Sequence, residues 1–371
     1  MNTETFLADP LLVAARDAAL IATSRMTHWR QRLDTALVEA KGDPNDLVTV
    51  ADAEIESLVA GYLRAARPQD TMVGEEGAAA RTLAEVPDGD RITARLLAGP
   101  DGSEPAPGAD PASTAGSAPA DPGSDLGPRD SDLAPGGAAA AEHASGADRL
   151  IEWHVDPIDG TVNYVRGIEQ HCFSVGGRDP ETGRWVIGLV AAPALRTVWF
   201  ARAGGGAWKT VGLPGPAEAS ASTADPDAPA NPATASGPAT PATANPLLVP
   251  GELEYTRLSG TPRGRRGRVL ATGFSYSPER RTLQLAALGR IMEEFDDIRR
   301  AGSAAVDLCY AAEGRVNAYC EYGINVYDWA AGAIIAEEAG LTVLRPAGES
   351  KLCIAADTPE RFAFLREHFY A

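Results

Sequence analysis

Two long segments of this chain lack the residues from which a hydrophobic core is built. Residues 87–148 and 212–245 are rich in Pro, Gly, Ala, Ser and Asp and nearly free of aromatic and large aliphatic side chains. Such segments cannot bury enough apolar surface to offset the entropy that is lost when a chain becomes ordered. We therefore expect both to be disordered inserts that loop out of a folded domain.

The remainder of the 371-residue chain has the length of a single domain made of two halves. In the first half, about residues 1–211, the helix-like segments 11–33 and 52–67 precede short strand-like runs, the last at 197–208, that indicate a meander. In the second half, about residues 246–371, strand-like and helix-like segments alternate. This order of elements predicts a layered α/β or α+β sandwich.

Charge and cysteine content exclude several classes of protein. The formal net charge of −18 argues against a nucleic-acid partner, and the only dense basic run, residues 262–268, is short enough to be a solvated loop. The four cysteines show no C-x-x-C spacing, so neither a zinc site nor a disulfide framework is expected. No signal peptide or run of eighteen apolar residues occurs, and we expect a soluble, cytoplasmic protein that does not bind membranes.

The stretch VDPIDGT places two carboxylates, those of Asp156 and Asp159, at the end of an apolar run. Like charges at short distance raise one another's pKa, so the pair needs a cation or hydrogen-bond donors. The two carboxylates and the Ile158 carbonyl are the oxygen ligands that Mg²⁺ prefers. Gly160 would allow a phosphate to approach, and Thr161 offers a hydroxyl. From these residues alone, an Asx turn followed by a helix cap remains an alternative.

Two further carboxylate-bearing turns strengthen the metal interpretation. TMVGEEG places Glu75 and Glu76 at a strand end before a glycine, and Asp328 opens a helix of small residues, where an aspartate is either a cap or a ligand. Three such turns are harder to explain as three independent caps than as one site. Together they predict a site for more than one metal ion.

The motifs resemble those of the inositol monophosphatase family. WHVDPIDGTVNYVR (153–166) is similar to the first signature of that family, and YDWAAGAII (327–335) is similar to the second. GEE at 74–76, KGDPNDLVTVAD at 41–52 and RRAGSAAVDLC at 299–309 occur in the family's order. The resemblance spans nearly all of the chain outside the two inserts. It implies an α-β-α-β-α sandwich of the inositol monophosphatase and fructose-1,6-bisphosphatase type, and Mg²⁺-dependent phosphomonoester hydrolysis.

The resemblance also implies a role for particular carboxylates. Glu75, Asp156 and the Ile158 carbonyl would hold a first Mg²⁺, and Asp156, Asp159 and Asp328 would hold a second. A third, weaker ion would share Glu75 and lie near Glu76, which gives two to three ions per site.

The remaining roles concern the attacking water and the substrate. By the same resemblance, Asp52 and Thr161 would orient and deprotonate a water molecule. The expected substrate contacts are Gly160, Thr161, Gly302, Ser303, Ala304 and Glu321, and Lys41 would lie near a loop over the site. Glu321 alone is weak support for hydroxyl recognition, because an exposed charge at a strand end would look the same.

The reaction is better defined by the sequence than the substrate is. An inositol 1-phosphate phosphatase is our first expectation, and histidinol phosphate is the nearest alternative, followed by fructose bisphosphate and phosphoadenosine phosphate. Aspartyl-phosphate chemistry is disfavoured, because it needs acids two residues apart and Asp156 and Asp159 are three apart. A catalytically silent sugar-phosphate-binding regulator would be expected to lose at least one ligand, and none is lost. The family resemblance further implies a homodimer.

Overall fold

The computed structural model describes most of the chain outside the two compositionally biased segments. It describes residues 1–32, 38–40, 47–86, 89, 149–215, 248–250, 253–260 and 266–369. Almost all of the first expected insert and residues 216–245 of the second lie outside the described residues, as does Lys41. Leu213–Gly215, at the start of the second expected insert, form strand β9, which pairs in parallel with β10 (Leu248–Pro250).

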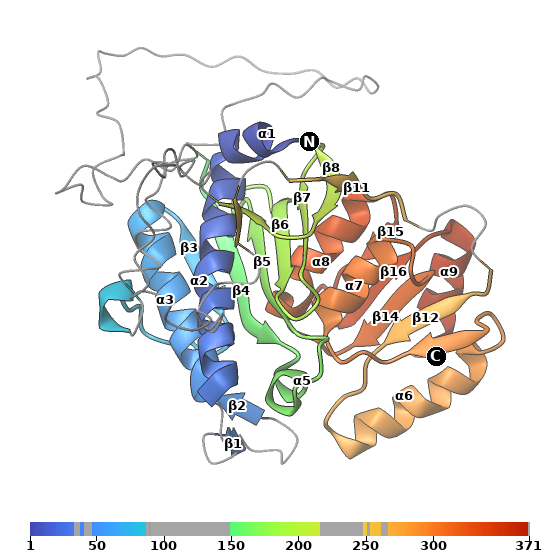
Figure 1. The fold of residues 1–371 in the computed structure, drawn as a ribbon. Helices are drawn as coiled ribbons and strands as arrows, with labels where there is room; N and C mark the ends of the chain where they lie inside the picture. Colours follow the sequence, from blue (N-terminus) through green and yellow to red (C-terminus); the bar gives the residue numbers. More distant parts are fainter. Residues whose placement is uncertain are drawn as a thin grey trace, which may run out of the picture.

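A seven-stranded sheet forms the centre of the first half, in the order β11-β8-β7-β6-β5-β4-β3 (Figure 1). Neighbouring strands from β4 to β11 are antiparallel, and only β3 and β4 pair in parallel. The strands are β3 (Thr71–Gly74), β4 (Glu152–Asp159), β5 (Cys172–Arg178), β6 (Trp185–Ala192), β7 (Thr197–Arg202), β8 (Gly206–Thr210) and β11 (Thr256–Arg257). The expected meander is therefore present, although the run 197–208 is a hairpin of two strands.

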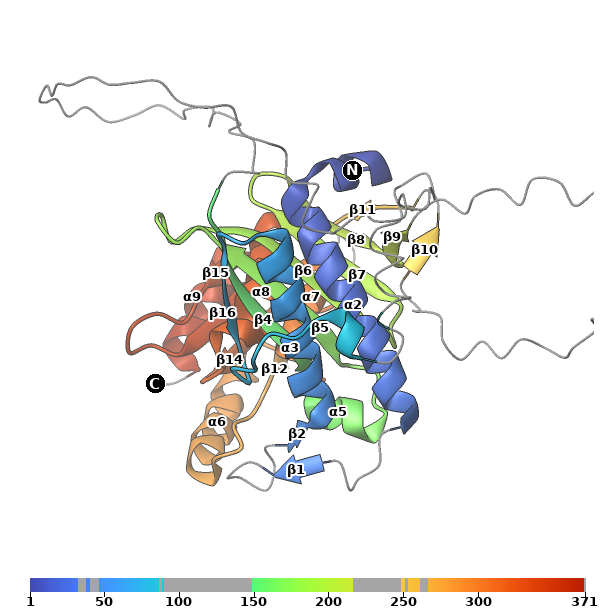
Figure 2. The same ribbon diagram turned by 90° about the vertical axis from the view of Figure 1, so that its left-hand side faces the viewer.

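Two long helices cover one face of this sheet, α2 (Pro10–Arg32) and α3 (Val50–Ala66), and Figure 2 shows both in front of it. The Asp9 carboxylate accepts hydrogen bonds from the amides of Leu11 (2.9 Å) and Leu12 (3.2 Å), which satisfies donors at the start of α2. The short elements nearby are α1 (Thr3–Ala8), β1 (Val38–Ala40), β2 (Leu47–Thr49) and a 3₁₀ turn (Leu83–Glu85).

Helices α7 (Ala304–Ala312) and α8 (Val326–Glu338) lie between the two large sheets (Figure 1). Small residues allow α8 to approach the first sheet closely. A Cβ atom on Gly188 of β6 would lie 2.5 Å from the Ile334 side chain and 2.7 Å from the Ala331 carbonyl oxygen. The helix that carries Asp328 is thus held tightly against the sheet that carries Asp156 and Asp159.

The second large sheet has five strands in the order β13-β12-β14-β16-β15, with α6 and α9 on its outer face. Strands β13, β12 and β14 are parallel, and β16 pairs antiparallel with both β14 and β15. The elements are β12 (Val269–Thr272), α6 (Pro278–Ile291), β13 (Asp297–Arg299), β14 (Ala318–Tyr322), β15 (Thr342–Leu344), β16 (Leu352–Ala356) and α9 (Pro359–His368).

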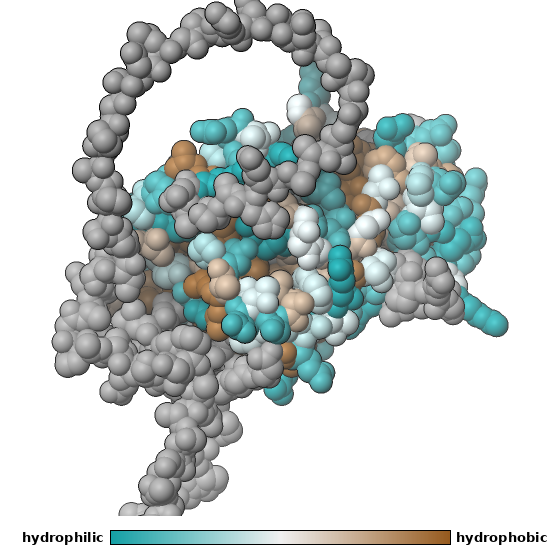
Figure 3. All heavy atoms as spheres, turned by 90° about the horizontal axis from the view of Figure 1, so that it is seen from above, coloured by the Kyte–Doolittle hydropathy of each residue, from teal (hydrophilic) through white to brown (hydrophobic). Residues whose placement is uncertain are grey.

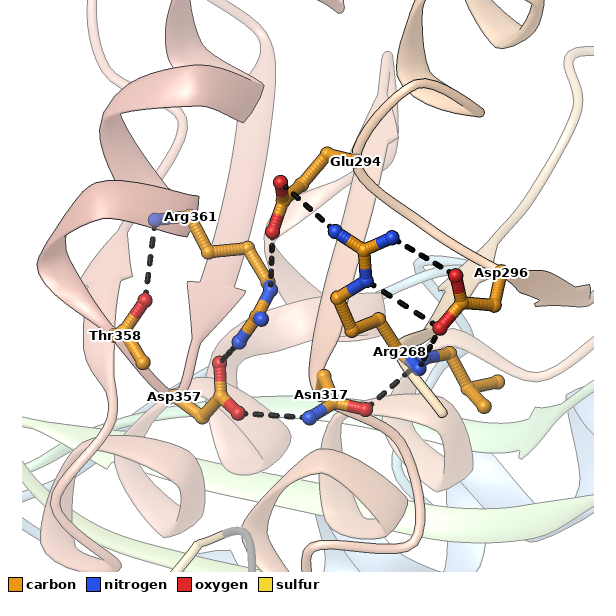
Figure 4. Close-up of polar contacts among 8 residues, drawn as sticks. Arg268, Glu294, Asp296, Asn317, Asp357, Thr358 and Arg361 are labelled. Carbon is orange, nitrogen blue, oxygen red and sulfur yellow. Dashed lines mark hydrogen bonds and ion pairs between the residues drawn. The ribbon is translucent and has the colours of Figure 1, made fainter. Parts of the chain in front are cut away.

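A polar network ties together the ends of this second sheet (Figure 4). The side chain of Asn317 accepts a hydrogen bond from the Val269 amide (2.9 Å) and donates to Asp357 (2.9 Å). Arg361 pairs with Asp357 and, at 3.3 Å, with Glu294. Asn317, Asp357 and Arg361 are all partly buried, so the loss of one partner would leave polar groups of the others unsatisfied.

The layers from one side of the molecule to the other are helix, sheet, helix, sheet and helix, which confirms the expected α+β sandwich. Seen from above, the described surface mixes hydrophilic and hydrophobic residues without one broad apolar face (Figure 3). Within the described residues, none of the helices combines the length and the apolarity that crossing a bilayer requires.

Candidate active site

The end of strand β4 brings Asp156 and Asp159 to the same face of the sheet. Side chains alternate along a regular strand, so residues three apart point to opposite faces. Here the pairing register shifts: Asp156 lies opposite Ser174 and Asp159 lies opposite Cys172, so β4 carries one extra residue. This bulge compensates for the odd spacing. Gly160, with φ of 88°, then turns the chain into α5 (Thr161–Arg166).

Asp328 joins this pair from a distant part of the sequence. It lies in the first turn of α8, where its carboxylate accepts a hydrogen bond from the Asn325 amide (2.5 Å). One carboxylate oxygen from each of Asp156, Asp159 and Asp328 lies within 4.8 Å of the other two. The helix cap and the ligand role considered for Asp328 are therefore compatible in one geometry.

The three carboxylates are electrostatically strained. Burial raises the pKa of Asp156 well above its usual value, and the charge of Glu75 and those of the two neighbouring aspartates raise it further. Burial likewise raises the pKa of Asp328, with the Asp159 charge adding to the effect. Burial raises the pKa of Asp159 to about 6, although hydrogen bonds from Ser303 and from backbone amides oppose the shift.

This cluster fits a hard cation. Asp156 is 2% exposed, and among the described residues its Oδ1 atom is buried without a hydrogen-bond partner. A buried carboxylate oxygen without a donor is costly, and several such groups together need an opposite charge. All available donor atoms are oxygens, which is the set that Mg²⁺ and Ca²⁺ prefer.

The start of helix α7 fixes the orientation of Asp159. The Ser303 hydroxyl and the Ala305 amide each donate a hydrogen bond to Asp159 Oδ2 at 2.7 Å. The Cys172 thiol lies 3.9 Å from the same oxygen. The Ser303 hydroxyl also accepts a hydrogen bond from the Val306 amide (3.2 Å) as the cap of α7. We expected Ser303 to contact the substrate. Its side chain is 1% exposed and donates its hydrogen bond to Asp159, a candidate metal ligand.

Glu75 and Glu76 follow directly after strand β3. Glu75 is exposed and Glu76 is partly buried, and the charge of Glu75 is the largest electrostatic contribution to the raised pKa of Asp156. The Glu56 side chain of α3, which is 2% exposed, accepts hydrogen bonds from the amides of Glu76 (2.7 Å) and Ala78 (2.8 Å). Sequence reasoning missed Glu56, although its position four residues after Asp52 places both acids on the same face of α3.

Asp52 and Thr161 are brought together as expected. The Thr161 hydroxyl lies 3.0 Å from the Ile158 carbonyl oxygen, to which it donates, and 3.5 Å from Asp52 Oδ2. Asp52 is 2% exposed and lies in the first turn of α3. A hydroxyl that contacts a carboxylate beside a cation site is suited to hold a water molecule and relay its proton.

The two glycine turns expected to bind substrate lie against each other. A Cβ on Gly160 would be 3.2 Å from the Gly302 carbonyl oxygen. Gly302 has φ of 98°, a conformation that favours glycine. Asn163 supports both turns, because its amide donates to the carbonyls of Gln170 (2.6 Å) and Ala301 (2.8 Å). The segment 302–304 thus begins α7 beside the Asp159 carboxylate.

Glu321 is the next-to-last residue of strand β14. Burial raises its pKa to about 7, and the Tyr319 hydroxyl donates a hydrogen bond to Glu321 Oε2 at 2.8 Å. Its carboxylate lies against the bare backbone of Gly273, where a Cβ would be only 2.1 Å from Glu321 Oε2. Sequence reasoning selected Glu321 but missed both Tyr319 and Gly273, which no local motif indicates.

Comparison with known proteins gives one consistent family. A model of the inositol monophosphatase family matches residues 128–367. Inositol-1-monophosphatase from Mycobacterium bovis is 30% identical over 325 residues, covering 87% of this chain and 77% of that protein. The solved structure of Mycobacterium tuberculosis SuhB is 25% identical with a TM-score of 0.57, covering 97% of this chain and 98% of the other. Nus factor SuhB from Pasteurella multocida is 31% identical over 196 residues, covering 53% of this chain and 57% of that protein.

Proposed function

Because the chain belongs to the inositol monophosphatase family and is therefore a phosphatase, we propose that it hydrolyses a small polyol monophosphate with Mg²⁺ as cofactor. Inositol 1-phosphate is the first substrate to consider. The observation that carries the proposal is the buried cluster of Asp156, Asp159 and Asp328, whose charges need divalent cations between them. A phosphoryl group, itself anionic, could not approach this cluster without them.

The proposed ligands are those expected from the sequence. Glu75, Asp156 and the Ile158 carbonyl would hold one Mg²⁺, and Asp156, Asp159 and Asp328 would hold a second, with Glu76 near a third. When bound, divalent cations supply charge neutralisation and a more acidic water molecule. The hydrogen bonds from Ser303 and Ala305 to Asp159 Oδ2 support this arrangement, because they leave Asp159 Oδ1 available for a cation.

Asp52 and Thr161 would handle the proton of the attacking water. The Thr161 hydroxyl, anchored by the Ile158 carbonyl, would hold the water in line with the phosphorus–oxygen bond that breaks. The Asp52 carboxylate, 3.5 Å from that hydroxyl, would accept the proton as the oxygen–phosphorus bond forms. The substrate oxygen would leave on the side opposite the water and take up a proton from solvent to give the alcohol.

The second half of the chain would bind the alcohol and the phosphate. The turns at Gly160 and Gly302 would lie against the phosphate, whereas Ser303 and the Ala304 amide, which bind Asp159, would act on the substrate through that carboxylate. Glu321, held by Tyr319, is suited to accept a hydrogen bond from a substrate hydroxyl. A carboxyl group in this position favours a polyol monophosphate over a bisphosphate, and the ammonium group of histidinol phosphate keeps that compound as the nearest alternative.

A second candidate function is regulation without catalysis. Its support is that some relatives carry the name Nus factor SuhB, including one 31% identical over 53% of this chain. The intact set of acids argues for catalysis, since a binding module has no need of Asp52 beside Thr161. A homodimer remains a prediction, which light scattering of the purified protein tests.

The deciding experiment is phosphate release by the purified full chain in the presence of Mg²⁺. The substrates to compare are inositol 1-phosphate, histidinol phosphate, fructose 1,6-bisphosphate and phosphoadenosine phosphate. We expect one dominant substrate, with activity abolished by a chelator and by Asp156→Asn. No release from any of them by folded protein that binds Mg²⁺ would favour the regulatory function instead.

A further inference from the structure

The loop that carries Glu75 is anchored by a buried acid outside the proposed ligand set. Glu56 is 2% exposed, and its two carboxylate oxygens each accept one hydrogen bond from this loop. Oε2 accepts from the Glu76 amide at 2.7 Å, and Oε1 accepts from the Ala78 amide at 2.8 Å. The two donors lie one and three residues after Glu75, so the carboxylate fixes the backbone just beyond the end of strand β3.

The contact is too close to be incidental. A Cβ atom on Gly74 would lie 2.4 to 2.6 Å from the three atoms of the Glu56 carboxyl group. Gly74 is the last residue of β3 and is paired with Val155 of β4, next to Asp156. Only a glycine at this position allows the carboxylate to lie directly against the backbone that leads into Glu75.

Glu56 also connects this loop to another part of the site. It lies on α3 four residues after Asp52, so the two acids are neighbours on one face of a helix whose packing against α2 makes it rigid. The loop is therefore anchored to the same helix that carries Asp52, the proposed proton acceptor. A charged acceptor makes stronger hydrogen bonds to amides than a neutral one does.

We propose that Glu56 is a positioning residue that holds the loop 74–78 so that the Glu75 carboxylate faces Asp156. The inference rests on the proposed function, in which Glu75 is a Mg²⁺ ligand. With Glu56 in place, the charge of Glu75 acts on Asp156 and raises the pKa of that carboxyl group. Without Glu56, the loop would lose two hydrogen bonds and Glu75 would sample orientations that do not face Asp156.

The chain offers a matched control on the same helix. Glu54 is also an acid of α3 that accepts two side-chain hydrogen bonds, from Arg25 (2.8 Å) and Trp29 (2.8 Å), but both partners belong to α2. Glu54→Gln and Glu56→Gln therefore remove the same charge from the same helix. Only the second loosens the loop of Glu75.

The test is a calorimetric titration of the metal-free full chain with Mg²⁺ alone. Glu56→Gln should weaken Mg²⁺ binding by about 10-fold, as is usual when a residue that orients a ligand is changed. Gly74→Ala should also weaken Mg²⁺ binding, because the added methyl group displaces the Glu56 carboxylate without removing it. Glu54→Gln should bind Mg²⁺ as the unmodified protein does.

A double variant separates this inference from the function on which it rests. If Glu56 acts through Glu75, then adding Glu56→Gln to Glu75→Gln should weaken binding no further. Equal Mg²⁺ affinities for Glu56→Gln and Glu54→Gln would overturn the inference and leave the ligand role of Glu75 intact. Unchanged affinity in Glu75→Gln would instead overturn the proposed ligand set. If Glu56→Gln does not fold, Gly74→Ala decides the outcome.

Discussion

Replacing Asp159 by asparagine should make the metal-free protein more stable while it abolishes hydrolysis. In the folded chain, burial raises the pKa of this carboxyl group to about 6, above the value of 3.8 taken for the unfolded chain. Asparagine keeps an oxygen that can accept the hydrogen bonds of Ser303 and Ala305, and it removes the charge. The substitution thus relieves the electrostatic cost of the site but removes a proposed cation ligand.

The magnitude follows from the two pKa values of Asp159. Because the folded state binds the proton more tightly, the free energy of unfolding falls as the pH rises from 3.8 to about 6, and it is constant above that range. Each pKa unit corresponds to about 1.4 kcal/mol, so the ionised group costs about 3 kcal/mol at pH 7.5. At pH 5 the same relation gives about 1.5 kcal/mol.

Urea unfolding in the presence of a chelator, at pH 7.5 and at pH 5, measures this cost directly. Asp159→Asn should be more stable than the unmodified chain by up to about 3 kcal/mol at pH 7.5 and by about half of that at pH 5. Asp179→Asn is the control, and it should lower the free energy of unfolding. Hydrogen bonds from backbone amides, first that of Thr182, lower the pKa of Asp179, so its ionised form stabilises the folded chain. A stability difference for Asp159→Asn that does not change with pH would refute the electrostatic reasoning.

Three further predictions concern other parts of the molecule. Asp52→Asn and Thr161→Val should each lower kcat for phosphate release by about 10²-fold or more while Mg²⁺ affinity stays the same; a loss of Mg²⁺ affinity instead would contradict their role with water. Tyr319→Phe removes the hydrogen bond that orients Glu321, and Gly273→Ala displaces the Glu321 carboxylate, so both should raise KM for a polyol phosphate by about 10-fold and should leave hydrolysis of p-nitrophenyl phosphate unchanged. Asn317→Ala should lower the free energy of unfolding by about 2 kcal/mol in urea titrations with kcat unaffected, since its network lies at the ends of the second sheet.

Local sequence patterns were sufficient for the elements whose signals are continuous along the chain. The helices 10–32 and 50–66 and the strand that ends at Asp159 lie within a few residues of their expected positions. Residues 197–208 were taken as one strand, although the turn around Gly204 divides them between β7 and β8. The turn is short and has strand-like residues on both sides, so the run looked continuous. Helix α9 was missed although Thr358 and Pro359 mark its start.

The site likewise contains residues that the sequence motifs indicate and contacts that they do not. Asp156, Asp159 and Asp328 belong to motifs that the sequence displays, and the structure brings them within 4.8 Å of one another. The contacts of Glu56 with the loop after β3, and of Ser303 with Asp159, join segments 20 and 144 residues apart. Neither the periodicity nor the spacing of residues in the sequence predicts such contacts, because they depend on how the layers pack.

The parallel pairing of β3 with β4 has a consequence for protein engineering. Thr71 lies opposite Glu152 in this pair, so two adjacent strands of the sheet are separated by a long stretch of sequence that contains the segment 87–148. The entropy of closing a flexible loop grows only with the logarithm of its length, and each doubling costs about 0.6 kcal/mol. A fluorescent domain whose own ends lie close together is therefore expected to fit into the connection between β3 and β4 at little cost to folding. Such a fusion would place an optical reporter in the part of the chain that follows the loop of Glu75, where it would report on cation binding.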